Sequence, residues 1–233
     1  DSSSSPPRRE SRKATTTTAA TSGPATPPAP GEGAAVTGET ECPPTDGSAE
    51  RTTSFENPPP NCLTDGVDYV AVFDTTEGEI RVDLDEAGMP ETVNNFVTLA
   101  RYGYYDDTAI FRTDDSIEII QGGSPTTNSV SDPGPGYTIT DEADGFTYEA
   151  GQLVMARSQG PDSSGAQFFF VAGPAAAALD AQGTYLVFGQ TDEAGLGVVQ
   201  SILDLGVTDP SGDPLASGPS RPVIVNSVTI EEA

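Results

Sequence analysis

The sequence contains no histidine, no tryptophan, one lysine and two cysteines among 233 residues. Without imidazole, serine-type catalytic triads and most catalytic zinc sites are excluded. Two thiols cannot form a four-cysteine metal cluster. No apolar run reaches the roughly 18 residues that a bilayer-spanning helix needs, so no membrane span is expected within the chain. The chemistry must therefore come from arginine, amides, carboxylates and shape, and we expect neither a metal nor a cofactor.

Positive charge is scarce. Lys and Arg together number 10 against 36 Asp and Glu, which gives a formal net charge of −26. Binding nucleic acid requires cations that neutralise phosphates, so no nucleic-acid partner is expected. An excess of surface carboxylate keeps protein molecules apart, which favours a monomer. A salty or extracellular environment and a genome-wide bias toward acidic proteins would explain the charge equally well.

Composition divides the chain into three segments. Residues 1–61 hold 11 of the 21 prolines but only one of the 16 aromatic residues, Phe55. Residues 1–40 are rich in Ser, Thr, Pro and Ala, and offer too little apolar surface to offset an ordering entropy of roughly 1–2 kcal/mol per residue. We expect them to form a disordered linker. Residues 41–65 surround the two cysteines, and residues 66–233 are long enough for one hydrophobic core.

Cys42 and Cys62 bracket a proline-rich loop 20 residues apart in the sequence. We expect them to form a disulfide that stabilises the fold by about 3 kcal/mol in the chain-entropy model. Two reduced thiols in the cytosol are the alternative. Disulfides persist in oxidising compartments, and residues 1–40 resemble a stalk. We therefore expect an exported protein, extracellular or cell-envelope associated, whose signal or anchor preceded Asp1 and has been removed.

Strand-like alternation begins near residue 65. Residues 69–73 and 79–84 predict a hairpin, and Pro90 begins a helix whose apolar residues recur at i, i+3, i+4 and i+7. Further segments complete the prediction: short strands around 117–121, 153–156, 167–171 and 186–188, a second helix over 196–203, and a closing strand over 223–230. Many short strands with two helices predict a mainly β fold, a closed antiparallel barrel capped by two α-helices.

Several short motifs follow one another in an order and spacing that together are specific. They are Thr92-Val93-Asn94-Asn95-Phe96 with Tyr104-Tyr105-Asp106, Ile120-Gln121-Gly122-Gly123, Gly134-Pro135-Gly136-Tyr137 with Asp141-Glu142, Met155-Ala156, Ser164-Gly165-Ala166-Gln167-Phe168-Phe169, Leu179-Asp180 and Val187-Phe188-Gly189. Through them, residues 66–233 resemble the cyclophilins, a barrel family of peptidyl-prolyl cis-trans isomerases. The resemblance implies a cyclophilin-like β-barrel that rotates Xaa-Pro bonds in proline-containing polypeptides.

Rotation of an Xaa-Pro bond suits a chain without histidine. Amide resonance sets a barrier of about 18–20 kcal/mol, and lowering it requires no proton transfer, nucleophile or metal. An arginine can hydrogen-bond to the twisted amide while an apolar pocket holds the proline ring. Such contacts accelerate rotation only if they are stronger in the twisted state.

The catalytic arginine is the point at which the sequence departs from the family pattern. Cyclophilins place it six residues after the Tyr-Tyr-Asp aspartate and eight before the Gln-Gly-Gly glutamine. Arg112 lies six residues after Asp106, whereas Thr113 lies eight residues before Gln121. This stretch therefore holds one residue more than the family pattern. We expect Arg112 to be catalytic, because a bulge can absorb one residue in a strand. Thr113 takes the position if the insertion lies before Arg112. A surface ion pair of Arg112 with Asp114 or Asp115 is the non-catalytic interpretation.

The resemblance assigns seven further residues to substrate binding. They are Gln121, Gln167 and Ala156 on the peptide backbone, and Phe169, Leu179, Ile117 and Tyr185 around the proline. Ile117 stands nearest to a pocket phenylalanine that the chain lacks, and Tyr185 stands where many relatives carry histidine. Phe169 could equally be an ordinary barrel residue, and the two glutamines ordinary strand-end amides. Ala178 replaces a tryptophan that often contacts cyclosporin, which puts binding of that drug in doubt.

Three functions remain open at this stage. The first is an isomerase that assists the folding of exported proteins. The second is a catalytically weak or inactive module that binds proline peptides, and the register around Arg112 separates it from the first. The third is an envelope-associated scaffold in which residues 1–40 are the functional part.

Overall fold

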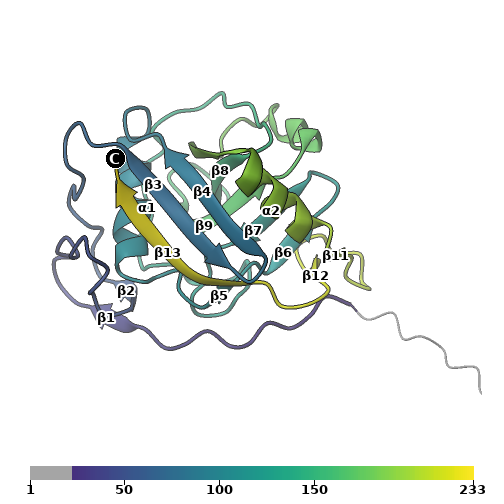
Figure 1. Ribbon diagram of the computed structural model, residues 1–233, viewed down its shortest axis with the longest axis horizontal. Helices are drawn as coiled ribbons and strands as arrows, with labels where there is room; N and C mark the ends of the chain where they lie inside the picture. The colour runs from purple at the N-terminus through teal and green to yellow at the C-terminus, as the bar shows by residue number, and fades with distance from the viewer. Residues whose placement is uncertain (1–22) are drawn as a thin grey trace, which may run out of the picture.

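A nine-stranded antiparallel sheet forms the centre of the computed structural model, which describes residues 23–233 (Figure 1). In spatial order its strands are β5 (Thr108–Ala109), β13 (Ile224–Glu232), β3 (Tyr69–Thr75), β4 (Gly78–Leu84), β10 (Val187–Thr191), β8 (Gln152–Arg157), β9 (Ser164–Val171), β7 (Ile119–Gly122) and β6 (Arg112–Asp114). The predicted hairpin is β3 and β4, paired from Val70↔Asp83 to Thr75↔Gly78.

The sheet curls so far that a short stretch of chain joins its two edge strands. β5 and β6 lie at opposite edges, yet only Ile110 and Phe111 separate them in sequence. The Ile110 amide donates to Val223 O (3.0 Å) on one side, and the Phe111 amide donates to Gln121 O (3.0 Å) on the other. These two residues carry the chain from one edge to the other. The predicted antiparallel barrel is confirmed.

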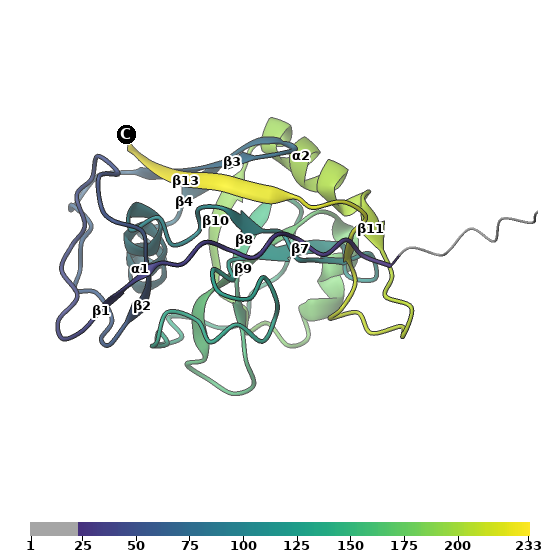
Figure 2. The same ribbon diagram turned by 90° about the horizontal axis from the view of Figure 1, so that it is seen from below.

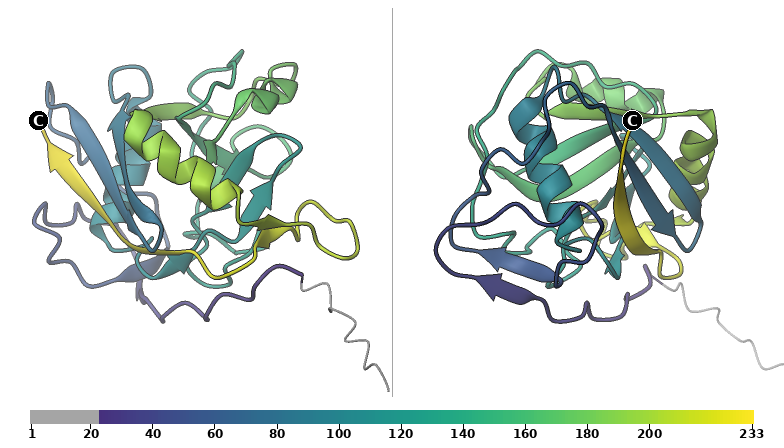
Figure 3. Two further views of the ribbon diagram at one scale, coloured as in Figure 1. Left: turned by 45° about the vertical axis from the view of Figure 1, so that its right-hand side comes forward. Right: turned by 60° about the vertical axis from the view of Figure 1, so that its left-hand side comes forward.

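Two α-helices pack against different parts of this sheet (Figure 3). α1 (Pro90–Arg101) lies beside β13, and its first turn donates backbone N–H groups of Glu91 and Thr92 to the Glu142 carboxylate, both at 2.7 Å. α2 (Glu193–Leu203) lies against β4. It begins three residues before the predicted start, because the Asp192 side chain accepts from Gly195 N and caps the helix. A 3-10 helix, η1 (Pro174–Leu179), was not predicted.

Aromatic rings fill the barrel. Phe73, Phe96, Phe168, Phe170 and Phe188 are fully buried, with neighbouring ring centroids such as Phe73–Phe168 at 5.3 Å and Phe96–Phe188 at 5.2 Å. Successive side chains of a strand point to opposite faces. On β9, Phe168 and Phe170 therefore enter the core, whereas Phe169 between them belongs to a second, smaller cluster.

Residues 23–40 differ from the linker predicted for residues 1–40, whose first 22 residues lie outside the described part. β1 (Ala34–Val36) pairs in parallel with β2 (Thr52–Phe55). The Ala25 amide donates to Pro219 O (2.8 Å), and Asn128 Nδ2 donates to Pro28 O (3.0 Å). This segment runs along the barrel (Figure 2). A segment that is poor in apolar residues is ordered here because its backbone finds hydrogen-bond partners on the domain.

The expected disulfide between Cys42 and Cys62 is present, with a Cα–Cα distance of 5.4 Å. Its loop is fastened to α1 by one side chain. Asn94 Oδ1 accepts from Cys62 N (2.7 Å), and Asn94 Nδ2 donates to Pro60 O (2.9 Å). No helix within residues 23–233 is long and apolar enough to cross a membrane.

Replacing Cys42 and Cys62 together by serine is expected to lower the free energy of unfolding by about 3 kcal/mol, because the unfolded chain regains the freedom of the closed loop. Denaturant unfolding of the parent and the double variant measures the difference. Reductant should destabilise the parent by a similar amount and leave the variant unchanged. A parent that is equally stable with and without reductant would contradict the prediction.

Candidate active site

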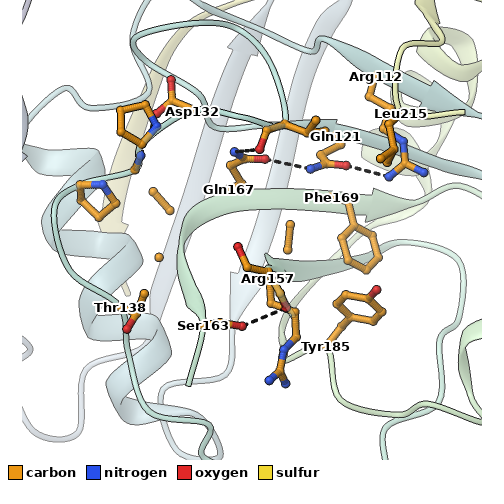
Figure 4. Close-up of a pocket in the computed structure, with 18 of the residues that line it drawn as sticks. Arg112, Gln121, Asp132, Thr138, Arg157, Ser163, Gln167, Phe169, Tyr185 and Leu215 are labelled. Carbon is orange, nitrogen blue, oxygen red and sulfur yellow. Dashed lines mark hydrogen bonds between the residues drawn. The ribbon is translucent and has the colours of Figure 1, made fainter. Parts of the chain in front are cut away.

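All eight residues that the sequence assigns to catalysis and substrate binding line one groove of about 510 Å³ (Figure 4). Four strands, a turn, a helix and a loop supply them: Arg112 comes from β6, Ile117 from the following turn, Gln121 from β7, Ala156 from β8, Gln167 and Phe169 from β9, Leu179 from the end of η1, and Tyr185 from the loop before β10. The structure brings these residues together, and their individual roles stay predictions.

The β6–β7 hairpin determines which residue faces the groove. Arg112 pairs directly with Gln121 across the two strands, and no irregularity interrupts the ladder. Thr113 points the other way and is 2% exposed, with its amide donating to Ser217 O (3.3 Å). Arg112 therefore faces the groove, and β6 is followed by the turn of residues 115–118, in which Glu118 adopts a φ of +46°. Where the extra residue of this stretch lies stays a prediction.

The Arg112 guanidinium is held on three sides. Nη2 pairs with Asp114 Oδ2 (2.6 Å), Nη1 donates to Gln121 Oε1 (2.9 Å), and Nε donates to Pro214 O (3.1 Å). A guanidinium carries five N–H groups, so two remain for a ligand after these contacts within residues 23–233. Arg112 forms the ion pair with Asp114, on which the non-catalytic interpretation rests, and it also lines the groove. The sequence offered no signal for Pro214, which lies 102 residues away.

A row of side-chain amides continues from Arg112 (Figure 4). Gln121 Nε2 donates to Gln167 Oε1 (2.9 Å), and Gln167 Nε2 donates to the carbonyls of Ser129 (3.4 Å) and Val130 (3.3 Å). These contacts fix how each amide is turned. Each amide keeps further donor or acceptor capacity, so the row is suited to hydrogen-bonding the backbone of an extended peptide.

The other side of the groove is apolar. Phe169 is 3% exposed, and the Tyr185 ring meets it edge-on with centroids 5.5 Å apart. Ile117, Leu179 and Ala156 pack against the same cluster. Phe169 therefore contributes to the pocket wall and is not a residue of the main core. Such a pocket fits a small apolar ring, and the remaining N–H groups of Arg112 can donate to polar atoms beside that ring.

Tyr148 holds Tyr185 in place, and sequence reasoning missed it because it lies in an irregular stretch before β8. Tyr148 Oη accepts from the Tyr185 amide (2.8 Å) and donates to the Tyr185 carbonyl (3.1 Å). Burial raises the pKa of the Tyr148 hydroxyl to about 12. The phenol thus stays protonated and can keep donating well above neutral pH.

Arg157, which follows Ala156, is a second cation in the groove wall. Its Nη1 lies 3.1 Å from Asp141 Oδ2 and donates to Thr184 O (2.9 Å). Asp141 therefore neutralises Arg157, just as the neighbouring Glu142 caps α1. The acidic pair of the sequence motif has structural roles. Within the described residues, no group of three or more His, Cys, Asp or Glu side chains is placed to hold a metal ion.

Comparison with known proteins points to one family. The family model described as "Cyclophilin type peptidyl-prolyl cis-trans isomerase/CLD" matches residues 70–230. A peptidyl-prolyl cis-trans isomerase of Synechococcus elongatus is 37% identical over 133 residues, covering 57% of this chain and 87% of the relative. Peptidyl-prolyl cis-trans isomerase cyp18 of Streptomyces antibioticus is 35% identical over 166 residues, covering 68% and 96%.

The fold has solved counterparts. A crystal structure of a Cryptosporidium parvum cyclophilin type peptidyl-prolyl cis-trans isomerase, in the presence of the dipeptide Ala-Pro, matches with a TM-score of 0.57 and 26% sequence identity. The match covers 70% of this chain and 98% of that one. The resemblance read from the motifs is therefore found independently by a family model, by sequence relatives and by structure.

The Tyr148→Phe variant is expected to be less stable than the parent by about 1 kcal/mol at pH 8, since it lacks both hydrogen bonds to Tyr185. Because the pKa of Tyr148 is raised to about 12, its contribution is complete below pH 10, the usual tyrosine pKa, and falls as the pH approaches 12. Denaturant unfolding of both proteins at several pH values measures the gap, which is the difference between their free energies of unfolding. The titration of the other tyrosines is common to both proteins and cancels in this difference. A gap that is constant from pH 8 to beyond pH 11 would contradict the raised pKa.

Proposed function

The chain belongs to the cyclophilin-type peptidyl-prolyl cis-trans isomerase family, and on that premise we propose that its groove catalyses the rotation of Xaa-Pro bonds. One observation carries the proposal: Arg112 pairs with Gln121 in the wall of the groove that also holds the Phe169 pocket. The Ala-Pro dipeptide named with the Cryptosporidium parvum structure supports proline-containing polypeptides as substrates.

The proline ring occupies the apolar pocket of Phe169, Leu179 and Ile117 while the rest of the peptide lies along the amide row. As the bond twists, conjugation is lost and the prolyl nitrogen regains a lone pair. The two remaining N–H groups of Arg112 then have a stronger acceptor than in the planar amide. This difference between twisted and planar states lowers the barrier of about 18–20 kcal/mol.

The contacts of Arg112 with Asp114, Gln121 and Pro214 hold the guanidinium in position before substrate arrives. A donor that is already oriented needs no reorganisation during bond rotation, which is the main source of electrostatic catalysis. The Arg112 and Asp114 side chains are 11% and 7% exposed, so little water competes for the pair. No group in this sequence of events has to gain or lose a proton.

A module that binds proline peptides without turning them over is the second candidate. The observation that favours it is the pairing of Arg112 with Asp114 at 2.6 Å, which commits one donor and offsets the positive charge. If this pair weakened the attraction between Arg112 and the twisted amide enough, the groove would bind the twisted amide no more tightly than the planar one. Equal binding of the two states gives no acceleration.

We further propose that the clients are exported proteins and that the chain works as a monomer in an oxidising compartment. The Cys42–Cys62 disulfide supports export, since such bonds persist outside the reducing cytosol. The net charge of −26 supports a monomer, since copies repel one another.

The Arg112→Ala variant is expected to lose about 100-fold or more in kcat/KM, as for removal of an oriented transition-state donor. A protease-coupled cis/trans assay on an Xaa-Pro peptide measures the loss. Thr113→Val is the matched control, since Thr113 faces away from the groove, and it should stay within about twofold of the parent. Arg112→Lys should recover little, because an ammonium cannot reproduce the planar fork.

Other outcomes of this assay would decide against the proposal. A folded parent that binds proline peptides but does not accelerate isomerisation would be the binding module. An Arg112→Ala variant that retains full activity, beside an impaired Thr113→Val, would move the catalytic role to Thr113.

Thiol trapping in fractionated source cells tests the proposed location. We expect Cys42 and Cys62 to resist alkylation until reductant is added, and the protein to be found in the extracellular or envelope fraction. Reduced cysteines that react at once, in a cytosolic fraction, would refute export while leaving the isomerase proposal intact.

A further inference from the structure

Two large apolar side chains stand out among residues 23–233 because they are exposed. Val130 is 38% exposed and Leu215 is 51% exposed, and both line the groove. Neither residue was singled out by the sequence motifs. The fold explains the buried apolar residues by their packing, but packing gives no account of a leucine that faces water.

Leu215 is held out by a loop that is braced from within. Residues 208–217 join β11 (Gly206–Val207) to β12 (Gly218–Pro219). The Asp213 carboxylate accepts from the Leu215 amide (2.9 Å), and Ser217 Oγ donates to Asp213 O (3.2 Å). Ser217 Oγ also accepts from the Asp209 amide (3.1 Å). These contacts fix the backbone on both sides of Leu215, so its exposure is a feature of an ordered loop.

The same loop is fastened to the strand that carries Arg112. The carbonyl of Pro214, the residue before Leu215, accepts from Arg112 Nε (3.1 Å). The carbonyl of Ser217 accepts from the Thr113 amide (3.3 Å). Leu215 therefore keeps a fixed position relative to Arg112. Figure 4 shows it beside Arg112, at the end of the groove away from Asp132 and Thr138.

We propose that Leu215 is a specificity-determining residue, which contacts a large apolar side chain next to the proline of a bound peptide. The inference rests on the proposed function of the groove. A peptide whose proline fills the Phe169 pocket must pass Leu215 on one side, because Leu215 adjoins Arg112 at that end. Contact removes apolar surface of both partners from water. Asp209 and Asp213 in the same loop disfavour an acidic side chain there.

Two peptide series test the proposal, one varying the residue before the proline and one the residue after it, through Leu, Phe, Ala and Glu. In the series that varies the side chain facing Leu215, the parent should prefer Leu and Phe over Ala by about fivefold or more in kcat/KM. This preference is within the range that a few methylene groups give an enzyme pocket. Glu should rank last. Leu215→Ala should reduce the preference in that series to below about twofold, and Leu215→Met should restore it.

Val130→Ala is the matched control, since it truncates the other exposed apolar residue of the groove. It should leave the preference in that series as it is in the parent. The proposal is overturned if the parent shows no preference in either series, or if the preference survives in Leu215→Ala. If no peptide is turned over at all, the proposed function fails instead. In that case the dissociation constants of the same peptides, measured by fluorescence titration, give the same preference ratios. They test the role of Leu215 separately from turnover.

Discussion

Closure of the barrel is the constraint on which the site depends. Only Ile110 and Phe111 carry the chain from edge strand β5 to edge strand β6; the Ile110 amide donates to Val223 O, just before β13, and the Phe111 amide donates to Gln121 O on β7. Because the Phe111–Gln121 bond continues the β6–β7 ladder into this short crossing, a slip of β6 along β7 would break that bond as well. A shift by one residue would turn every side chain of β6 to the opposite face. The position of Arg112 opposite Gln121 is therefore a consequence of how the barrel is closed.

Strand alternation then separates the functions of neighbouring residues. On β9, Phe168 and Phe170 fill the core while Phe169 and Gln167 face the groove. The wall of the groove is thus the outer surface of the same strand whose other side is held by packed aromatic rings. The two faces of β9 thus serve the packed core and the groove, where Gln167 joins the hydrogen-bonded row that begins with Arg112 on β6 and Gln121 on β7.

Much of this arrangement follows from local sequence. The β3–β4 hairpin and α1 could be predicted because alternation and helix periodicity act over a few residues, and the joint location of all eight candidate site residues was implied by the resemblance to the cyclophilins. Contacts between distant segments could not be predicted. Arg112 meets Pro214 across 102 residues and Asn128 meets Pro28 across 100. Nothing in the composition of residues 23–40 indicates order, since their hydrogen-bond partners, such as Pro219 O and the Asn128 side chain, lie elsewhere in the chain. The turn of residues 115–118 likewise depends on the pairing of β6 with β7.

Both arginines of the groove wall are paired with carboxylates, Arg112 with Asp114 and Arg157 with Asp141, and neither arginine side chain is more than 11% exposed. Mobile ions screen charges in solution over roughly 8–10 Å at moderate ionic strength, but they reach buried pairs poorly. A change of salinity therefore alters the repulsion among the exposed surface carboxylates far more than it alters these two ion pairs. The chain combines an outer shell that responds to its ionic surroundings with a groove whose two arginine–carboxylate pairs are largely shielded from them.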